Sequence, residues 1–124
     1  MLPSKRRSKS RQNRLNKVFS FLARHVPKLS RIKLFIGCPV IRQERKKSKR
    51  AFCHVGHHKE AICCAPETAR LPLNHIVGLL LHELGHLATG KGDLEADVWC
   101  AKVLGVPIQY KGKLHLEWVD LKPH

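Results

Sequence analysis

The residues best suited to chemistry in this chain are two histidines four positions apart, His82 and His86, with Glu83 directly after the first. On an α-helix, residues four apart lie one above the other on the same face, so both imidazoles can bind one zinc ion. Glu83 would lie beside that face, where it can take a proton from a water molecule on the metal and pass it to a leaving amine. The pattern predicts a catalytic metal centre, and the alternative is two histidines on an ordinary solvated helix.

The stretch that holds these residues, Leu73 to Ala88, is apolar nearly all the way round, which is typical of a buried helix. Burying two imidazoles and a carboxylate is costly unless something satisfies them, and a metal ion is the simplest solution. Gly78 and Gly85 each weaken a helix by about 1 kcal/mol relative to alanine. Their presence indicates that another backbone or a ligand comes close.

A second helix is predicted directly after the first. Gly90 is typical of a residue that ends a helix, and Asp93 is typical of a side chain that caps the start of the next. Apolar residues then recur at helical spacing until Gly105 and Pro107 stop the helix. Because few residues separate the two helices, the first turn of the second must lie near His86.

Three acidic residues open this second helix, and a catalytic zinc usually needs a third protein ligand beside its water. Asp93 and Asp97 lie four residues apart and share a face, whereas Glu95 points elsewhere. We expect Asp93 to be the third ligand and Asp97 to accept a hydrogen bond from a histidine ring, which would fix its tautomer. Two alternatives stay open: Glu95 is the ligand, or all three acids only cap the helix.

These two runs of residues, His82–His86 (HELGH) and Asp93–Asp97 (DLEAD), resemble the gluzincin-type zinc metallopeptidases. In the CaaX-prenyl and heat-shock membrane proteases, and in the phage-immunity antirepressor proteases, a helix reading Glu-x-Glu-Ala-(Asp/Asn) follows the metal helix. The first Glu of that motif binds zinc and the Asp supports the site. By position, Asp93 replaces that Glu and Asp97 matches that Asp. The resemblance covers about residues 72–107.

The resemblance implies a zinc metalloendopeptidase that acts on a protein or peptide substrate. Its zinc ligands would be His82, His86 and Asp93. Glu83 would act as general base and then as general acid, and Asp97 would orient the ligands. The chain departs from the family in two ways: the aspartate is one methylene shorter than the family's glutamate, and the connection between the helices is unusually short.

Charge divides the chain sharply. Residues 1–50 hold 17 Lys and Arg and one acid, Glu44, for a net charge of +16, whereas residues 51–124 hold 7 basic and 8 acidic residues, for a net of −1. We therefore predict a disordered basic tail (1–13), a basic extension of helix and strand (14–50) and a zincin-like metal-site domain (51–124). Only the basic part of the chain argues for a polyanionic partner.

Within the extension, apolar residues at helical spacing predict a basic amphipathic helix from about Arg14 to His25. Arg31 to Val40 alternates like a strand, and the charge run from Gln43 to Arg50 is predicted to be a loop or hairpin tip. Three interpretations of this region compete: a solvated or helix-covering arm, an arm that binds nucleic acid or a ribonucleoprotein, and a mitochondrial-type transit segment. A membrane-surface helix is a minor fourth.

Two short strands, Ala51–Val55 and Glu60–Ala65, are predicted to form a hairpin. In the peptidases that the chain resembles, a sheet edge beside the metal helix binds the substrate backbone as an added strand. The resemblance therefore implies that Ile62–Ala65, or the strand paired with it, forms the substrate ledge.

A second hairpin is predicted from Ile108–Tyr110 and Leu114–Leu121. Tyr110 or His115 could stabilise a tetrahedral oxyanion, because such sites use Tyr or His donors. A hairpin that is simply packed is the favoured alternative.

The odd number of cysteines and the lack of a Cys-x-x-Cys motif argue against a complete disulfide framework. We expect mostly buried thiols in an intracellular, cytoplasmic protein, or a mitochondrial one if residues 1–25 are a transit segment. No transmembrane segment is expected. A rival prediction is a second, structural zinc site drawn from Cys53, His57, His58, Cys63 and Cys64.

The expected architecture is α+β: a small mixed or antiparallel sheet packed on the metal helix and the helix after it, with a basic N-terminal helix. The expected function is zinc-dependent hydrolysis of peptide bonds, with the basic arm targeting a polyanion. The alternative is a nucleic-acid or ribonucleoprotein-binding protein whose zinc is structural or inactive.

Overall fold

The structure, a computed structural model, places the chain in two compact units, unit 1 (Met1–Leu71) and unit 2 (Pro72–His124). It describes residues 2–49, 52–55, 60–105, 108–109 and 113–114. The elements of unit 1 are α1 (Leu2–His25), η1 (Pro27–Arg31), β1 (Lys33–Ile36), α2 (Pro39–Lys47), β2 (Cys53–Val55), β3 (Ala61–Cys64) and η2 (Pro66–Arg70). Those of unit 2 are α3 (Leu73–Thr89), α4 (Asp93–Trp99), the π-helical turn η3 (Cys100–Leu104), β4 (Ile108–Gln109) and β5 (Lys113–Leu114).

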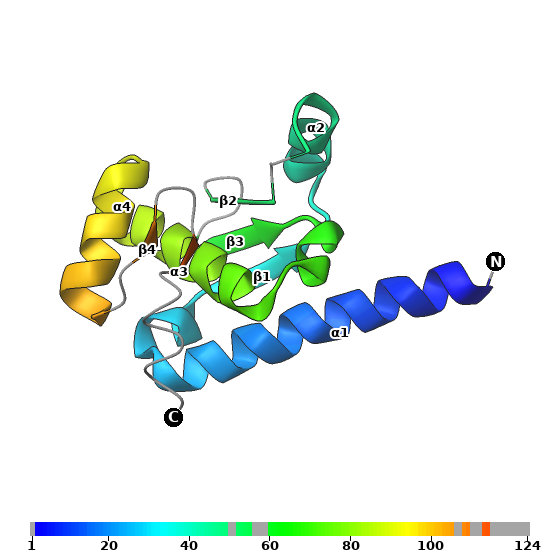
Figure 1. The fold of residues 1–124 in the computed structure, drawn as a ribbon, viewed down its shortest axis with the longest axis horizontal. Coiled ribbons are helices and arrows are strands. Elements are labelled where there is room, and N and C mark those ends of the chain that lie inside the picture. Colours follow the sequence, from blue (N-terminus) through cyan, green and yellow to red (C-terminus); the bar gives the residue numbers. More distant parts are fainter. Residues whose placement is uncertain (1, 50–51, 56–59, 106–107, 110–112, 115–124) are drawn as a thin grey trace. The chain divides into compact units, whose positions relative to one another are not determined.

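Helix α1 is continuous from Leu2 to His25 (Figure 1). Leu15 and Leu22 on its apolar stripe are buried, as the helical spacing of the sequence predicted. The helix also runs through residues 2–13, where the sequence analysis expected a disordered tail. Pro3 does not interrupt it because the backbone N–H that proline lacks has no partner in the first turn of a helix.

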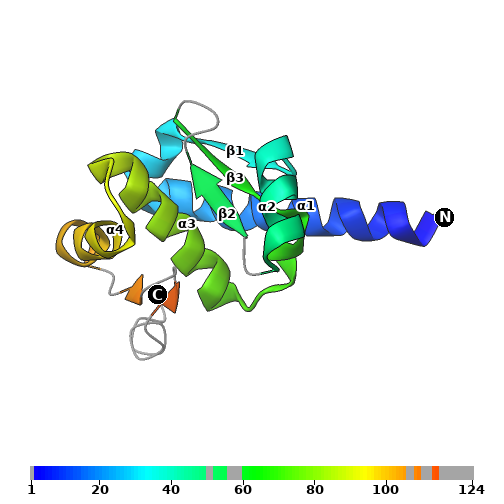
Figure 2. The same cartoon turned by 90° about the horizontal axis from the view of Figure 1, so that it is seen from above.

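The sheet of unit 1 is mixed, in the order β1-β3-β2 (Figure 2). Strand β3 pairs in parallel with β1 and antiparallel with β2, so the hairpin predicted from β2 and β3 is confirmed. Because β3 also pairs with β1, the strand region belongs to the basic unit. The two compact units divide after Leu71, whereas the domain boundary predicted from charge lies after residue 50. The strand predicted over Arg31–Val40 is shorter, and only Lys33–Ile36 is extended in the sheet.

Helix α2 corrects the loop predicted for Gln43–Arg50. The backbone turns into this helix at Cys38, whose sulfur accepts a hydrogen bond from the Ile41 backbone N–H at 3.4 Å, and Pro39 occupies the first turn. The charged residues that follow are good helix formers, and they lie mostly on the surface. A run of charge was mistaken for a loop because an exposed helix of nine residues leaves only a weak apolar pattern.

In unit 2, α3 confirms the helix predicted over Leu73 to Ala88, and Gly90 ends it in the left-handed conformation, at φ 67°. Gly105 ends the following helical segment in the same way, at φ 69°. The predicted N-cap is wrong by one residue: Gly92 is the cap, and Asp93 is the first residue of α4, with its side chain turned to other partners. Strands β4 and β5 pair antiparallel, as expected for the second hairpin.

The α+β class predicted from the sequence is confirmed. Among the described helices, none combines the length and the apolar character needed to cross a bilayer.

Candidate metal centre

The site in unit 2 depends on a close crossing of α3 and α4 at Gly85. A Cβ atom built on Gly85 would lie 2.6 Å from the backbone oxygen of Ala96, which is closer than real side chains approach. The Cys100 thiol, one turn further on, donates a hydrogen bond to the Leu81 carbonyl at 3.1 Å. The backbone approach predicted at this glycine is confirmed, and it brings the first turn of α4 against the histidine face of α3.

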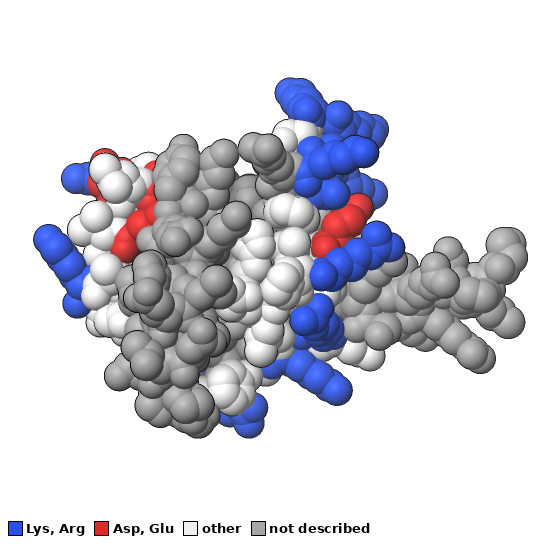
Figure 3. Space-filling model, in the orientation of Figure 1, with Lys and Arg blue, Asp and Glu red and all other residues white. Residues whose placement is uncertain are grey.

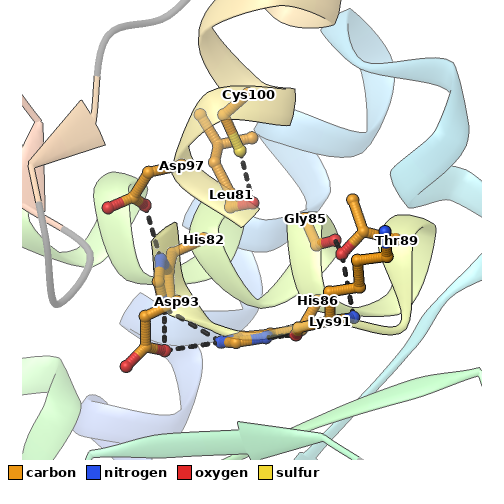
Figure 4. Close-up of polar contacts among 9 residues, drawn as sticks. All are labelled: Leu81, His82, Gly85, His86, Thr89, Lys91, Asp93, Asp97 and Cys100. Carbon is orange, nitrogen blue, oxygen red and sulfur yellow. Dashed lines mark hydrogen bonds and ion pairs between the residues drawn. The ribbon is translucent and has the colours of Figure 1, made fainter. Parts of the chain in front are cut away.

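Three donor atoms meet at this crossing (Figure 4). The Nε2 atoms of His82 and His86 lie 3.1 Å apart, and Oδ1 of Asp93 lies 3.0 Å from the first and 2.8 Å from the second. The two imidazoles come from consecutive turns of α3 and the carboxylate from the start of α4. The three residues expected to be ligands are therefore brought together as one cluster that could hold a metal ion.

The other ring nitrogens fix the tautomers. Nδ1 of His82 lies 2.6 Å from Oδ1 of Asp97, and Nδ1 of His86 lies 2.7 Å from the Lys91 carbonyl oxygen. A carbonyl can only accept, and Asp97 is placed to accept as well, so each Nδ1 carries the proton and donates. Each Nε2 then turns a lone pair toward Asp93. This contact of Asp97 is the one that the sequence analysis expected, and it is the usual outer support of a histidine ligand.

The size of the cluster suits a small cation. In a tetrahedral zinc site with bonds of about 2.0–2.1 Å, neighbouring ligand atoms are roughly 3.3 Å apart. The three distances between His82, His86 and Asp93 are only a few tenths of an ångström shorter. A cation can enter by a slight widening of the cluster, and Zn²⁺ accepts this set of donors.

Electrostatics at the cluster favour positive charge. Burial alone would lower the pKa of His86, but the hydrogen bond to Lys91 and the carboxylates of Glu83 and Asp93 raise it above 6.5. Burial would raise the pKa of Asp93, yet its bonds to the two imidazoles bring it below 3.8. The pKa of Asp97 is raised, chiefly by burial. The same carboxylates that raise the pKa of His86 would also attract a bound cation.

The cluster is open on one side. The His82 side chain is 5 % exposed, whereas that of Asp93 is 42 % exposed. Glu83 is buried on α3 next to these ligands, and its carboxylate acts on the pKa of His86. Solvent therefore reaches the cluster from the side of Asp93, and the charge of Glu83 acts on the cluster through His86.

Other expectations for the site fare differently. Glu95 is exposed and does not join the cluster, so the geometry favours Asp93 over it as the third ligand. A groove of about 530 Å³ runs along α4 from Thr89 to Val103, and its lining does not include the cluster. Tyr110 and His115, the oxyanion candidates, lie outside the described residues.

Of the two strands expected to offer a substrate ledge, Ile62–Ala65 and the strand paired with it, the sheet order excludes the first. Strand β3 lies in the middle of its sheet and is paired on both sides, so it has no edge to offer an added strand. Strand β2, the partner named as the alternative ledge, does lie at the edge.

Sequence reasoning missed a second cluster, in unit 1, formed by Cys38, His54 and Cys63. Only Cys63 belonged to the structural site proposed from the sequence. No local spacing links the three residues, because they meet through the pairing of β1, β2 and β3. The pairing of the hairpin was the one available signal, since it places His54 directly opposite Cys63.

Comparison with known proteins gives no match among family models, curated proteins or solved structures.

Proposed function

We propose that unit 2 is a zinc-dependent peptidase site of the gluzincin kind. The observation that carries the proposal is the convergence of two imidazole Nε2 atoms and one carboxylate oxygen within 2.8–3.1 Å of one another. Asp97 and the Lys91 carbonyl accept the Nδ1 protons of the two rings, which leaves each Nε2 free of a proton, as metal binding requires. The resemblance of the HELGH and DLEAD runs to the gluzincins supports the same function.

In this proposal the residues of the chain have separate tasks. His82, His86 and Asp93 hold the cation, which supplies a Lewis acid that polarises a peptide carbonyl and acidifies water. Asp97 keeps the His82 ring oriented. Glu83 removes a proton from the attacking water and returns it to the leaving amine, as a buried carboxylate beside a cation can do.

The test is Glu83→Gln in the full chain, with Glu95→Gln as the matched control. Glu83→Gln should keep bound Zn²⁺ while cleavage of a pool of fluorescence-quenched peptides falls by at least about 100-fold. Glu95→Gln, an exposed carboxylate on α4, should leave both properties unchanged. Cleavage retained by Glu83→Gln would refute this mechanism. A wild-type chain that binds Zn²⁺ and cleaves nothing would favour a structural or inactive zinc site.

A second candidate function rests on the charge of unit 1. Residues 1–71 hold 19 Lys and Arg against 3 acidic residues, a net charge of +16. Lys and Arg side chains gather over α2 (Figure 3), where Arg42, Lys46 and Lys47 are exposed. Such a surface suits phosphate groups, so we propose that unit 1 binds nucleic acid, either in addition to a peptidase activity of unit 2 or as the main activity of the chain.

A further inference from the structure

We infer that Cys38, His54 and Cys63 form a second metal site, in unit 1, that binds Zn²⁺ through two thiolates and one imidazole. One donor atom from each of the three residues lies within 4.8 Å of the others. The site shares no residue with the cluster on α3 and α4, so it does not depend on the proposed peptidase function.

The fold brings the three residues together from three elements. His54 on β2 and Cys63 on β3 are directly opposite each other in the antiparallel ladder, so their side chains leave the sheet on the same face. Cys38 is reached from β1 through Gly37, whose φ of 80° suits glycine and whose N–H donates to the Cys64 carbonyl at 2.8 Å. This turn sets Cys38 at the start of α2, beside the other two.

The donor atoms are aimed as a metal requires. Nε2 of His54 lies 3.0 Å from Sγ of Cys38. The other ring nitrogen lies 3.4 Å from the Val55 carbonyl oxygen, which can only accept, so that nitrogen carries the proton and Nε2 has the lone pair. With Zn–S bonds of about 2.3 Å and Zn–N bonds of about 2.1 Å, neighbouring ligands in a tetrahedral site are roughly 3.5–3.8 Å apart. The Cys38–His54 distance is about half an ångström shorter than this, and all three donor atoms lie within 4.8 Å of one another, so a cation could enter by a small widening of the cluster.

Two of the three proposed ligands are buried. Cys63 is fully buried and Cys38 is 6 % exposed, and they pack with Ile41, Ala65 and Val40. Burial and the neighbouring Cys38 raise the pKa of Cys63 to about 12, so binding of a cation by this sulfur would release a proton. The positive end of α2 adds to the stabilisation of an anionic sulfur at Cys38.

A cysteine–histidine pair alone would also suit an activated nucleophile. The third donor argues for a metal instead, because the buried sulfur of Cys63 lies beside the other two donor atoms and completes a soft ligand set. Soft thiolates with an imidazole select Zn²⁺ over Mg²⁺ or Ca²⁺.

The remaining strand cysteines provide matched controls. Cys53 and Cys64 are also opposite each other, but they leave the sheet on the other face, with their sulfurs 2.8 Å apart. Neither belongs to the described metal clusters. The same chemical change, Cys→Ser, can therefore be made on either face of the same two strands.

The experiment is a Co²⁺ titration of the reduced, metal-free full chain, because cobalt bound to thiolate gives a near-ultraviolet charge-transfer band that a site of histidine and aspartate lacks. The wild type should bind two Co²⁺, one of them with the thiolate band, and Zn²⁺ should displace both. Removing the peptidase cluster with His82→Ala should leave the thiolate band and reduce the stoichiometry to one. Failure of the peptidase proposal is thus distinguished from failure of this one.

Cys63→Ser should lower the thiolate band by at least half, whereas Cys64→Ser and Cys53→Ser should leave it unchanged. Circular dichroism checks folding, and because Cys63 is buried, His54→Gln serves as a second variant at a half-buried position. It should weaken the thiolate-bound Co²⁺ at least tenfold while the fold is kept. No thiolate band in the wild type, or a band lost with Cys53 and Cys64 but kept without Cys63 and His54, would overturn the inference.

Discussion

At His82 and His86, one nitrogen of each ring is already committed before any cation arrives. Asp97 and the Lys91 carbonyl take the two Nδ1 protons, at 2.6 Å and 2.7 Å. The remaining lone pairs cannot both bond to a carboxylate oxygen without a proton or a cation between them. A proton and a metal ion therefore compete for the same position. The stability of the metal-free protein and the stabilisation by a bound metal should change in opposite directions with pH.

This competition predicts the pH dependence of stability. The pKa of His86 is raised in the folded state above 6.5, so its contribution to the free energy of unfolding is complete below pH 6.5 and is lost as pH rises through the folded value. The pKa of Asp93 is lowered below 3.8, so its contribution is present above that pH and is lost on acidification below it. The metal-free protein should become less stable as pH rises above 6.5, whereas stabilisation by Zn²⁺ should increase over the same range.

Urea unfolding from about pH 6 to 8, with and without Zn²⁺, checks this prediction. Both tryptophans of the chain, Trp99 and Trp118, belong to unit 2, so their fluorescence follows the unit that holds the cluster. His86→Ala is the control. Its free energy of unfolding should change little between pH 6 and 8, both with and without Zn²⁺. Parallel slopes with and without Zn²⁺ in the wild type would contradict the competition.

The two clusters differ in how far the sequence could predict them. His82 and His86 are related by one helical turn, and Asp93 follows after a short connection, so the sequence places all three near one another before the crossing of α3 and α4 brings Asp93 into contact. The members of the other cluster, Cys38, His54 and Cys63, meet only when a parallel strand pair forms across the chain. Spacing along a single sequence does not contain that pairing.

At the scale of elements, the crossing of α3 and α4 decides whether Asp93 and Asp97 reach the histidines at all. The contact at Gly85 involves the backbone of Ala96, and a backbone atom cannot move aside without its helix. Helix α4 therefore has to stay close to α3 for the cluster to form.

Gly85→Ala should disrupt this crossing. Alanine improves helix propensity by about 1 kcal/mol. The added Cβ, 2.6 Å from a backbone oxygen, makes overpacking the larger effect, at about 1–3 kcal/mol of destabilisation. We expect a net loss of stability and at least tenfold weaker Zn²⁺ binding, measured by urea unfolding and calorimetric titration.

Gly92→Ala is the matched control for that substitution. Its Cβ would lie 3.2 Å from the end of the Glu95 side chain, which is exposed and can move, and its φ of −77° suits any residue. The loss in free energy of unfolding should stay within about 1 kcal/mol, and Zn²⁺ binding should be retained. Equal effects of the two substitutions would show that the crossing does not position the cluster.

Sequence patterns predicted the elements unevenly, for physical reasons. Helix α3 was predicted closely because a long apolar run and a terminal glycine leave few other options. Helix α2 was missed because most of it faces solvent and only Ile41 is buried. The position of Asp93 in α4 was wrong by one residue because Gly92 caps the helix and frees the carboxylate for the imidazoles.

At the scale of the whole molecule, the excess of basic charge lies within one of the two compact units. Unit 1 carries a net charge of +16, and unit 2, with 5 Lys and Arg against 6 acidic residues, carries −1. Basic charge confined to one folded unit should give a polyanion-binding surface there and none on the unit that holds the α3–α4 cluster. Deleting the residues before Ser30 would not test that surface cleanly. The deletion removes Leu15 and Leu22, which are buried, and would therefore destabilise unit 1 as well.

Charge reversal on the surface avoids this difficulty. The paired change Lys46→Glu and Lys47→Glu alters two exposed side chains of α2, and Lys91→Glu with Lys102→Glu makes the same change of net charge in unit 2. If α2 contacts phosphates, the first pair should weaken binding to a short DNA duplex at least tenfold. It should also reduce the slope of log affinity against log salt by about 2, since each lost contact removes about 0.9. The second pair should change the slope little, because unit 2 supplies no contacts.

Equal losses of affinity from the two pairs would mean that only net charge attracts DNA. An affinity that does not depend on salt would remove the basis for a phosphate-binding surface on α2.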